Sequence, residues 1–309
     1  MKVILSRKGF DSGIGGYASP ILPDGTLLSL PIPEEGADIC YSHLKTQDGK
    51  TYMDIMKSIN EKVKYGEKKW KDLNEECSCH LDPDLRKGVI KRQTNWKSIF
   101  GQASAAQTHL QNNGVEKDDL FLFFGWFRNT IMKDNRIVFD PKDKEGRHIL
   151  YGYMQIGEKI IVNKSTNIKE WMSYHPHVAG NHDRHSNNTI YIERDNLSWN
   201  SNLPGAGIFN YDNSLVLTKG GLTRSKWQLP PVFKNVEITY HSNKSWKSEK
   251  GIEYFQSVGR GQEFVIEQNA EIEEWIKCII ENNRVVLNNV DNIMPGSISS
   301  NYNKSEIIT

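Results

Sequence analysis

The stretch "DDLFLFFGWFR", Asp118–Arg128, decides the fold. It is a continuous run of apolar and aromatic residues without polar alternation, which is typical of a strand that is buried on both faces. A second apolar stretch, "HILYGYMQIGEKIIV" at 148–162, follows it closely and predicts one or two further strands. These two stretches together predict the centre of a sheet.

Shorter β-like segments lie on both sides of this centre. They are "MKVIL" (1–5), "DGTLLSLPIP" (24–33), "NNTIYIE" (187–193), "SLVLT" (214–218), "VEITYH" (236–241) and "GQEFVIE" (261–267). Helical patterns are fewer, at 51–73, 100–114 and 271–280, and the last has isoleucines and a tryptophan at helical spacing. Because strands and helices do not alternate regularly, we expect an α+β fold with a central curved sheet or barrel and peripheral helices.

Composition limits the classes of protein to which the chain can belong. Its 309 residues are 37% hydrophobic and 25% charged, which is typical of a globular protein. We expect one domain over 1–295 and a loose polar tail at 296–309. The net charge of +1 provides no general basic field, so any contact with nucleic acid must come from a local patch. No apolar run approaches the roughly 20 residues of a membrane span, and four cysteines without a disulfide framework indicate the cytoplasm.

The glycine-rich loop "SRKGFDSGIGG", 6–16, carries charged side chains next to flexible backbone. Arg7 offers a planar fork and Lys8 a point charge for a phosphate, while Asp11 could orient a ribose hydroxyl, act as a base or bind a metal. The glycine spacing matches neither a dinucleotide-binding fingerprint nor a P-loop. The alternative is a surface turn with a weak salt bridge between Arg7 and Asp11.

A second polar constellation is "CSCHLDPDLR", 77–86. Its proline separates Asp82 from Asp84 and aims the two carboxylates differently, and two unequal carboxylates near His80 can serve as acid and base. A helix N-cap or Asx-turn is the alternative. The cysteines beside His80 lack the usual spacing of zinc ligands. The basic stretch that follows, 86–97, suits either a nucleic-acid backbone or a solvated surface.

Histidines and aromatic residues supply the remaining candidates. "HPHVAGNHDRH", 175–185, holds four of the nine histidines, and His175 and His177 suit either a metal or hydrogen bonds to a ligand. Trp126 and Tyr151 could stack on a base with Arg128 on its phosphate, although such aromatic residues are often simply core.

These motifs resemble those of the nucleotide modification associated domain 3 family. The matching stretches are "SRKGFDS", "HLDPDL", "FGQASAAQTHL", "DDLFLFFGWFR", "HPH", "NNTIY" and "GQEFVIE", which extend from Ser6 to Glu267. The middle of the chain is also similar to PUA-, EVE- and ASCH-like barrels, although Asp118 occupies the usual glycine position.

The resemblance implies a role around modified nucleotides or DNA bases, often in phage or mobile-element settings, and implies neither a settled reaction nor a particular cofactor. The family's motif positions would be Arg7, Lys8, Asp11, Ser12, His80, Asp82, Asp84, Gly101, Gln102, Arg128, His175, His177, Asn188 and Thr189.

Three functions remain open. The first is an enzyme that modifies a nucleotide or base by glycosidic-bond or transferase chemistry, with Asp11, Asp82 or His80 as acid and base. In it, Gln102 or Asn188 reads the base edge by hydrogen bonds. The second is a module that binds a modified nucleotide, free or in DNA, without turning it over. The third is a metal-dependent nuclease or phosphoesterase that would use Asp11, Asp82, His175 and His177, although the sequence by itself assigns no metal site.

Overall fold

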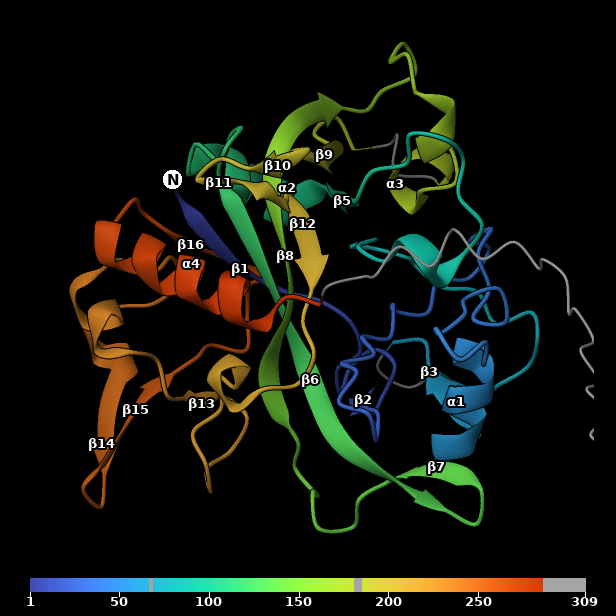
Figure 1. Ribbon diagram of the computed structural model, residues 1–309, viewed down its shortest axis with the longest axis horizontal. Helices are drawn as coiled ribbons and strands as arrows, with labels where there is room; N and C mark the ends of the chain where they lie inside the picture. The colour runs from blue at the N-terminus through green and yellow to red at the C-terminus, as the bar shows by residue number, and fades with distance from the viewer. Residues whose placement is uncertain (67–68, 181–184, 286–309) are drawn as a thin grey trace, which may run out of the picture.

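The centre of the computed structural model, which describes residues 1–66, 69–180 and 185–285, is a pair of long antiparallel strands. They are β6 (Leu120–Lys133) and β8 (Arg147–Ile161), which cross the molecule in Figure 1. The first half of β6 is buried on both faces, as its unbroken apolar run predicts, and Phe121, Phe123 and Phe124 are fully buried.

The main sheet has mixed strand directions. Its strands lie in the order β16 (Glu263–Ile266), β1 (Val3–Arg7), β6, β8, β9 (Thr189–Glu193) and β5 (Ile99–Gln102), with β2 (Ser19–Ile21) and β7 (Arg136–Phe139) on β6 and β12 (Ala206–Ile208) on β8. β1 and β2 run parallel to β6, whereas the other pairs are antiparallel. Within the described residues this order does not close into a barrel, so the fold is α+β with an open central sheet.

Small sheets and helices surround the main sheet. The small sheets pair β3 (Lys62–Lys64) with β4 (Trp70–Asp72), β10 (Asn196–Leu197) with β11 (Asn200–Pro204), and β13 (Lys226–Trp227), β14 (Trp246–Glu249) and β15 (Ile252–Gln256) with one another. The α-helices are α1 (Tyr52–Ile59), α2 (Ser104–Asn112), α3 (Pro176–Ala179) and α4 (Ala270–Asn283). None of the helices in the described ranges is long and apolar enough to cross a membrane.

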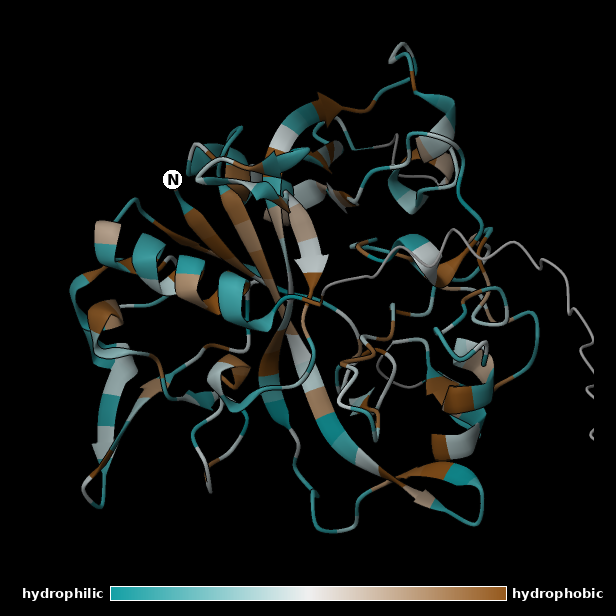
Figure 2. Cartoon of the chain, in the orientation of Figure 1, coloured by the Kyte–Doolittle hydropathy of each residue, from teal (hydrophilic) through white to brown (hydrophobic). Residues whose placement is uncertain are grey.

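Helix α4 closes the main core. Asn269 caps it, because the side-chain oxygen accepts hydrogen bonds from the amides of Glu271 and Ile272. The helix buries Ile272, Ile276, Ile279 and Ile280 in the same cluster as the central strands, as its periodicity predicts. Figure 2 shows the mostly polar outer face of α4 beside the hydrophobic strands. Burying one such side chain contributes about 1.5–3 kcal/mol, so this face is sufficient to hold the helix in place.

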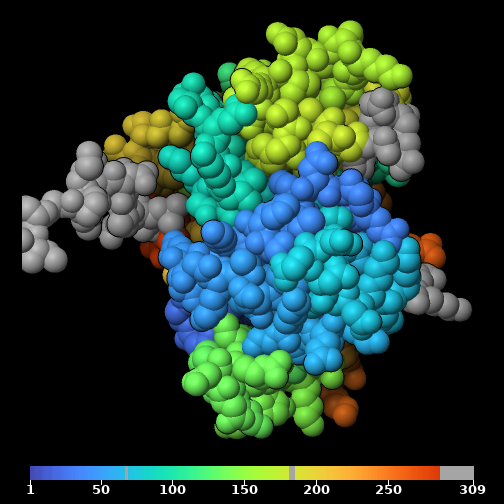
Figure 3. Space-filling model, turned by 90° about the vertical axis from the view of Figure 1, so that its right-hand side faces the viewer, coloured from blue at the N-terminus to red at the C-terminus, as the bar shows by residue number. Residues whose placement is uncertain are grey.

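A second core packs the N-terminal layer against the sheet. It gathers Phe10, Tyr41 and the buried residues of α1 with apolar side chains from the 73–89 region. Figure 3 shows this layer in blue in the middle of one face, between the yellow-green segment that leads to α3 and the green β6–β7 turn. The layer lies beside β6 and β7, since β2 pairs with β6 and Ile137 of β7 belongs to this core.

Several predicted elements are shorter than expected or absent. The predicted helix 51–73 ends at Ile59, because Asn60 is extended and the chain continues as the β3–β4 hairpin. The predicted helix 100–114 begins as β5 and becomes helical only at Ser104. The predicted strands 24–33, 214–218 and 236–241 form only isolated bridges or a short 3-10 turn. Apolar side chains of these segments are buried in the core although their backbone is irregular. An apolar pattern in these segments therefore does not indicate strand pairing.

The predicted tail at 296–309 lies outside the described residues, as do His182 and Asp183 of the histidine-rich stretch.

Candidate functional site

A cavity of about 1150 Å³ opens beside the carboxyl ends of β1 and β5 and the start of β16. Segments far apart in the sequence line it: 7–14, 32–34, His80 and Asp82, 101–104, Trp126, 144–145, His148, His177, His185, 223–225, 257–259 and Gln262. Pockets for small ligands commonly measure about 300–1,000 Å³, so this space is large enough for a nucleotide.

The cavity gathers part of the predicted site. Arg7, Lys8, Asp11, Ser12, His80, Asp82, Gln102, Trp126 and His177 line it. Asp84, Arg128, Tyr151, His175, Asn188 and Thr189 do not. The cavity is therefore lined by all three of these features: the glycine-rich loop, the first aspartate of Asp-Pro-Asp and one aromatic residue of β6.

Asp82 is the most enclosed acid of the cavity, with a side chain only 5% exposed. Its Oδ1 accepts a hydrogen bond of 2.8 Å from the Gly101 amide and lies 3.3 Å from His175 Nε2. Burial by itself would raise the pKa of Asp82, but the contact with His175 and the nearby histidines hold it at about 2. Asp82 is therefore ionised at neutral pH.

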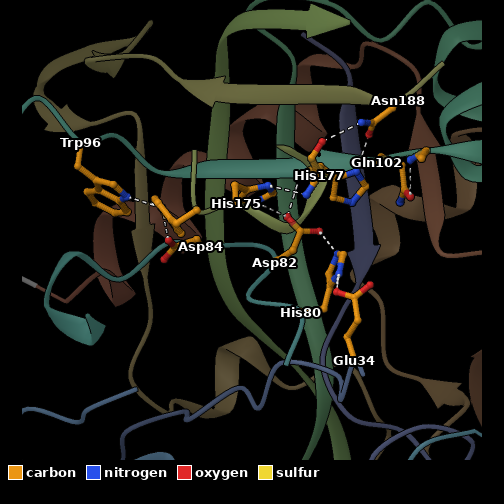
Figure 4. A network of polar contacts seen from close by, with 12 residues as sticks. Glu34, His80, Asp82, Asp84, Trp96, Gln102, His175, His177 and Asn188 are labelled. Atoms are coloured by element: carbon orange, nitrogen blue, oxygen red, sulfur yellow. Dashed lines mark hydrogen bonds and ion pairs between the residues drawn. The ribbon is translucent and has the colours of Figure 1, made fainter. Parts of the chain in front are cut away.

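Two histidines present their rings to Asp82 (Figure 4). His80 Nδ1 lies 2.8 Å from Glu34 Oε2, and its Nε2 lies 3.8 Å from Asp82 Oδ2. His177 Nδ1 lies 2.7 Å from Asn188 Oδ1, while the Asn188 amide donates to the His177 carbonyl. Since a carboxylate and an amide oxygen only accept hydrogen bonds, we assign a proton to Nδ1 of each ring.

The fold explains why His177 can approach so closely. A Cβ on Gly101 would lie 2.3 Å from Cγ and Cδ2 of the His177 ring, so only glycine fits in β5 at this point. The same backbone amide anchors Asp82. Burial lowers the pKa of His177 to about 3, more than the nearby Asp82 charge raises it, so the ring is neutral near pH 7.

Asp84 faces a different environment. Arg92 Nη2 and the Tyr174 hydroxyl each donate to its carboxylate at 2.6 Å, and Asp84 is 1% exposed. The Arg92 guanidinium also lies 4.5 Å from the ring centroid of Trp96, whose indole donates to the Tyr174 hydroxyl. Part of the basic stretch 86–97 thus forms a buried structural cluster behind the cavity wall.

The glycine-rich loop uses many of its polar groups internally. Asp11 Oδ1 accepts hydrogen bonds from the amides of Gly13 and Ile14, which makes an Asx-turn. Arg7 Nη2 donates to the carbonyls of Gly259 and Gly261 at 2.8 Å each, so the guanidinium holds the 257–262 segment against the cavity. Ser12 is exposed at the cavity rim.

Lys8 and Gln102 share one buried acid. Lys8 Nζ lies 2.7 Å from Glu263 Oε1, and Gln102 Nε2 donates to the same oxygen at 2.8 Å. Gln102 Oε1 accepts from the Ala103 amide. Because Glu263 neutralises Lys8, the ammonium offers a phosphate less net charge than an unpaired lysine would.

The other predicted residues lie outside the cavity lining. Arg128 donates to the Asp143 carbonyl and lies over the Phe139 ring, and Tyr151 packs among core aromatic rings. His175 is fully buried behind Asp82, and the Thr189 hydroxyl donates to the Asn187 carbonyl.

Sequence reasoning missed Arg224, which lies in an irregular loop without a recognisable motif. Its guanidinium stacks 3.8 Å from the centroid of Trp126, and among the described residues its Nη1 has no hydrogen-bond partner. The charges of Arg224 and Arg7, after burial, lower the pKa of His148 to about 3, so both cations lie near this ring. Arg7, Arg224, Trp126 and His148 define the cationic end of the cavity.

Glu34 was also missed, because it contacts His80 across 46 positions of the sequence. A proline-rich loop that carries a glutamate has no local feature that points to a site. Its position is set by backbone bonds such as that from the His80 amide to the Ile32 carbonyl, at 2.8 Å.

Comparison with known proteins gives one match. The family model of nucleotide modification associated domain 3 matches residues 2–267. No curated protein and no solved structure matches the chain. Because the matched region includes most of the 309 residues and every described segment of the cavity, the chain belongs to the nucleotide modification associated domain 3 family.

Proposed function

We propose that the cavity binds a nucleotide, or a base of a nucleic acid, and that the protein modifies it. One observation carries the proposal: a single cavity joins a cationic, aromatic end to an end with two histidines and an ionised aspartate. Family membership associates the chain with nucleotide modification in general terms.

The cationic end suits the phosphate. Arg224 presents a planar guanidinium that is stacked on Trp126, and Arg7 lies near the same space. Guanidinium groups bind phosphate oxygens in a bidentate manner, and Trp126 offers an aromatic surface for a base. With a net charge of +1 for the whole chain, binding must depend on local cations such as this pair of arginines.

The opposite end suits the chemistry. Asp82 is ionised and His177 is neutral near pH 7, so both present acceptor lone pairs to a bound substrate. His80 lies beside them and is oriented by Glu34. We assign His80, Asp82 and His177 to the modifying reaction and the cationic end to substrate binding.

Binding is tested by isothermal titration with a panel of nucleoside mono-, di- and triphosphates and short DNA. Arg224→Ala should weaken the best ligand by about 10–100-fold, because a hydrogen bond to a charged group contributes about 1.5–3 kcal/mol. Arg128→Ala is the matched control, since Arg128 also covers an aromatic ring but lies outside the cavity wall. Equal affinities in the two variants would refute the phosphate assignment.

Turnover is tested separately, by incubation of the protein with that ligand and mass spectrometry of the products. We expect a new product from the wild type and none from Asp82→Asn, with binding retained in the variant. Binding without any product would instead identify a module that recognises a nucleotide without modifying it.

A further inference from the structure

Three side chains at the chemical end of the cavity are close enough to share one ion. The ligand atoms of His80, Asp82 and His177 all lie within 4.8 Å of one another. Because both rings direct Nδ1 to an oxygen, each turns Nε2 toward the cavity (Figure 4). Two imidazole nitrogens and one carboxylate form a recurring set of ligands for divalent transition metals.

The groups behind these side chains are those that metal ligands require. Glu34 accepts from His80 and Asn188 accepts from His177, which fixes the orientation and tautomer of each ring. Asp82 is held through Oδ1 by the Gly101 amide, so the other oxygen, Oδ2, points toward His80. Each of the three side chains is therefore oriented by a group of the surrounding wall.

The spacing argues for an ion between the side chains. His80 Nε2 and Asp82 Oδ2 are 3.8 Å apart, which is too long for a direct hydrogen bond. Two ligand atoms about 2.1 Å from a shared ion lie about 3–3.5 Å apart in tetrahedral or octahedral geometry. A small inward movement of either side chain would bring the pair to this distance.

We propose that His80, Asp82 and His177 bind one divalent first-row transition metal ion. Imidazole ligands favour iron, cobalt or zinc over calcium, magnesium and manganese, which prefer oxygen ligands. The three ligands found among the described residues leave further coordination positions on the ion, on the side of the cavity that these residues line. A role for this ion in the reaction rests on the proposed function, whereas its binding does not.

The test uses the full-length protein, stripped with a chelator and titrated with Co²⁺, Zn²⁺ and, without oxygen, Fe²⁺. Bound metal is measured by elemental mass spectrometry, and Co²⁺ also by its visible absorption. We expect about one ion per chain. His80→Ala and His177→Ala should each reduce metal affinity by about 100-fold or more, and Asn188→Ala by about 10–100-fold through the loss of ring orientation.

The control is His43→Ala, since His43 is exposed and does not line the cavity. Circular dichroism checks that each variant is folded. If a histidine variant does not fold, Asp82→Asn replaces it, because this change preserves the side-chain volume and the oxygen that faces Gly101. Absence of metal binding by the wild type, or equal binding by wild type and His80→Ala, would overturn the proposal. Titration without nucleotide keeps this result independent of the nucleotide-binding test.

Discussion

Replacement of Gly101 by alanine tests the closest contact of the site. The added Cβ would lie 2.3 Å from two atoms of the His177 ring, whereas ordinary contacts begin at 3.4 Å, so the ring must move by about 1.1 Å. That movement would stretch the 2.7 Å hydrogen bond to Asn188 beyond its useful range.

The expected loss of stability combines two effects. Overpacking of a close-packed interior typically costs about 1–3 kcal/mol, and the loss of one hydrogen bond adds about 1 kcal/mol. We therefore expect Gly101→Ala to lower the free energy of unfolding by about 2–4 kcal/mol, measured by urea denaturation. The substitution should also weaken metal binding, because His177 would no longer face His80 and Asp82.

Gly220→Ala is the matched control. A Cβ at Gly220 would have no neighbour within 4 Å, and neither glycine has a positive φ angle, so this control measures a glycine-to-alanine change without a clash. The double variant Gly101→Ala/His177→Ala removes the ring that clashes, so it should be less destabilised than the two single effects added together. If Gly101→Ala were as stable as Gly220→Ala, the packing argument would be refuted.

Three further predictions concern groups outside the proposed metal ligands. Burial raises the pKa of Glu193 from 4.5 to about 7, because the folded protein favours the neutral carboxyl group. The stability that depends on this neutral form is fully present below pH 4.5 and is lost as the pH rises to 7. In urea titrations, Glu193→Gln should therefore be about 1–2 kcal/mol more stable than wild type at pH 8 and equally stable at pH 4.5. This difference is smaller than the full pKa shift would give, because the Glu193 side chain is partly accessible to solvent. Arg92→Ala leaves the buried Asp84 carboxylate without its cation, so thermal unfolding should show a loss of about 3–5 kcal/mol; a change below about 1 kcal/mol would contradict the buried pair. Asp11→Ala removes the Asx-turn, and we expect faster amide exchange at Gly13 and nearly unchanged metal binding; protected amides in the variant would count against the turn.

The local sequence pattern was sufficient to predict the elements whose burial is visible in their own residues, such as β6 and α4. The run at 118–128 has no polar face, so its pattern favours a strand with core on both sides, and the isoleucine spacing of 271–280 places one stripe of a helix on that core. Where apolar residues contact the core from irregular backbone, as at 214–218, the same reasoning predicts a strand that does not form.

The site was determined by contacts between distant segments. Asp82 and Asp84 are two residues apart and chemically identical, yet one lies beside two histidines in the cavity and the other is buried under Arg92. No local pattern separates them, because the difference arises where β5 passes behind them. Glu34 and Arg224 lacked any motif for the same reason: their roles follow from the side chains that the tertiary structure brings to them.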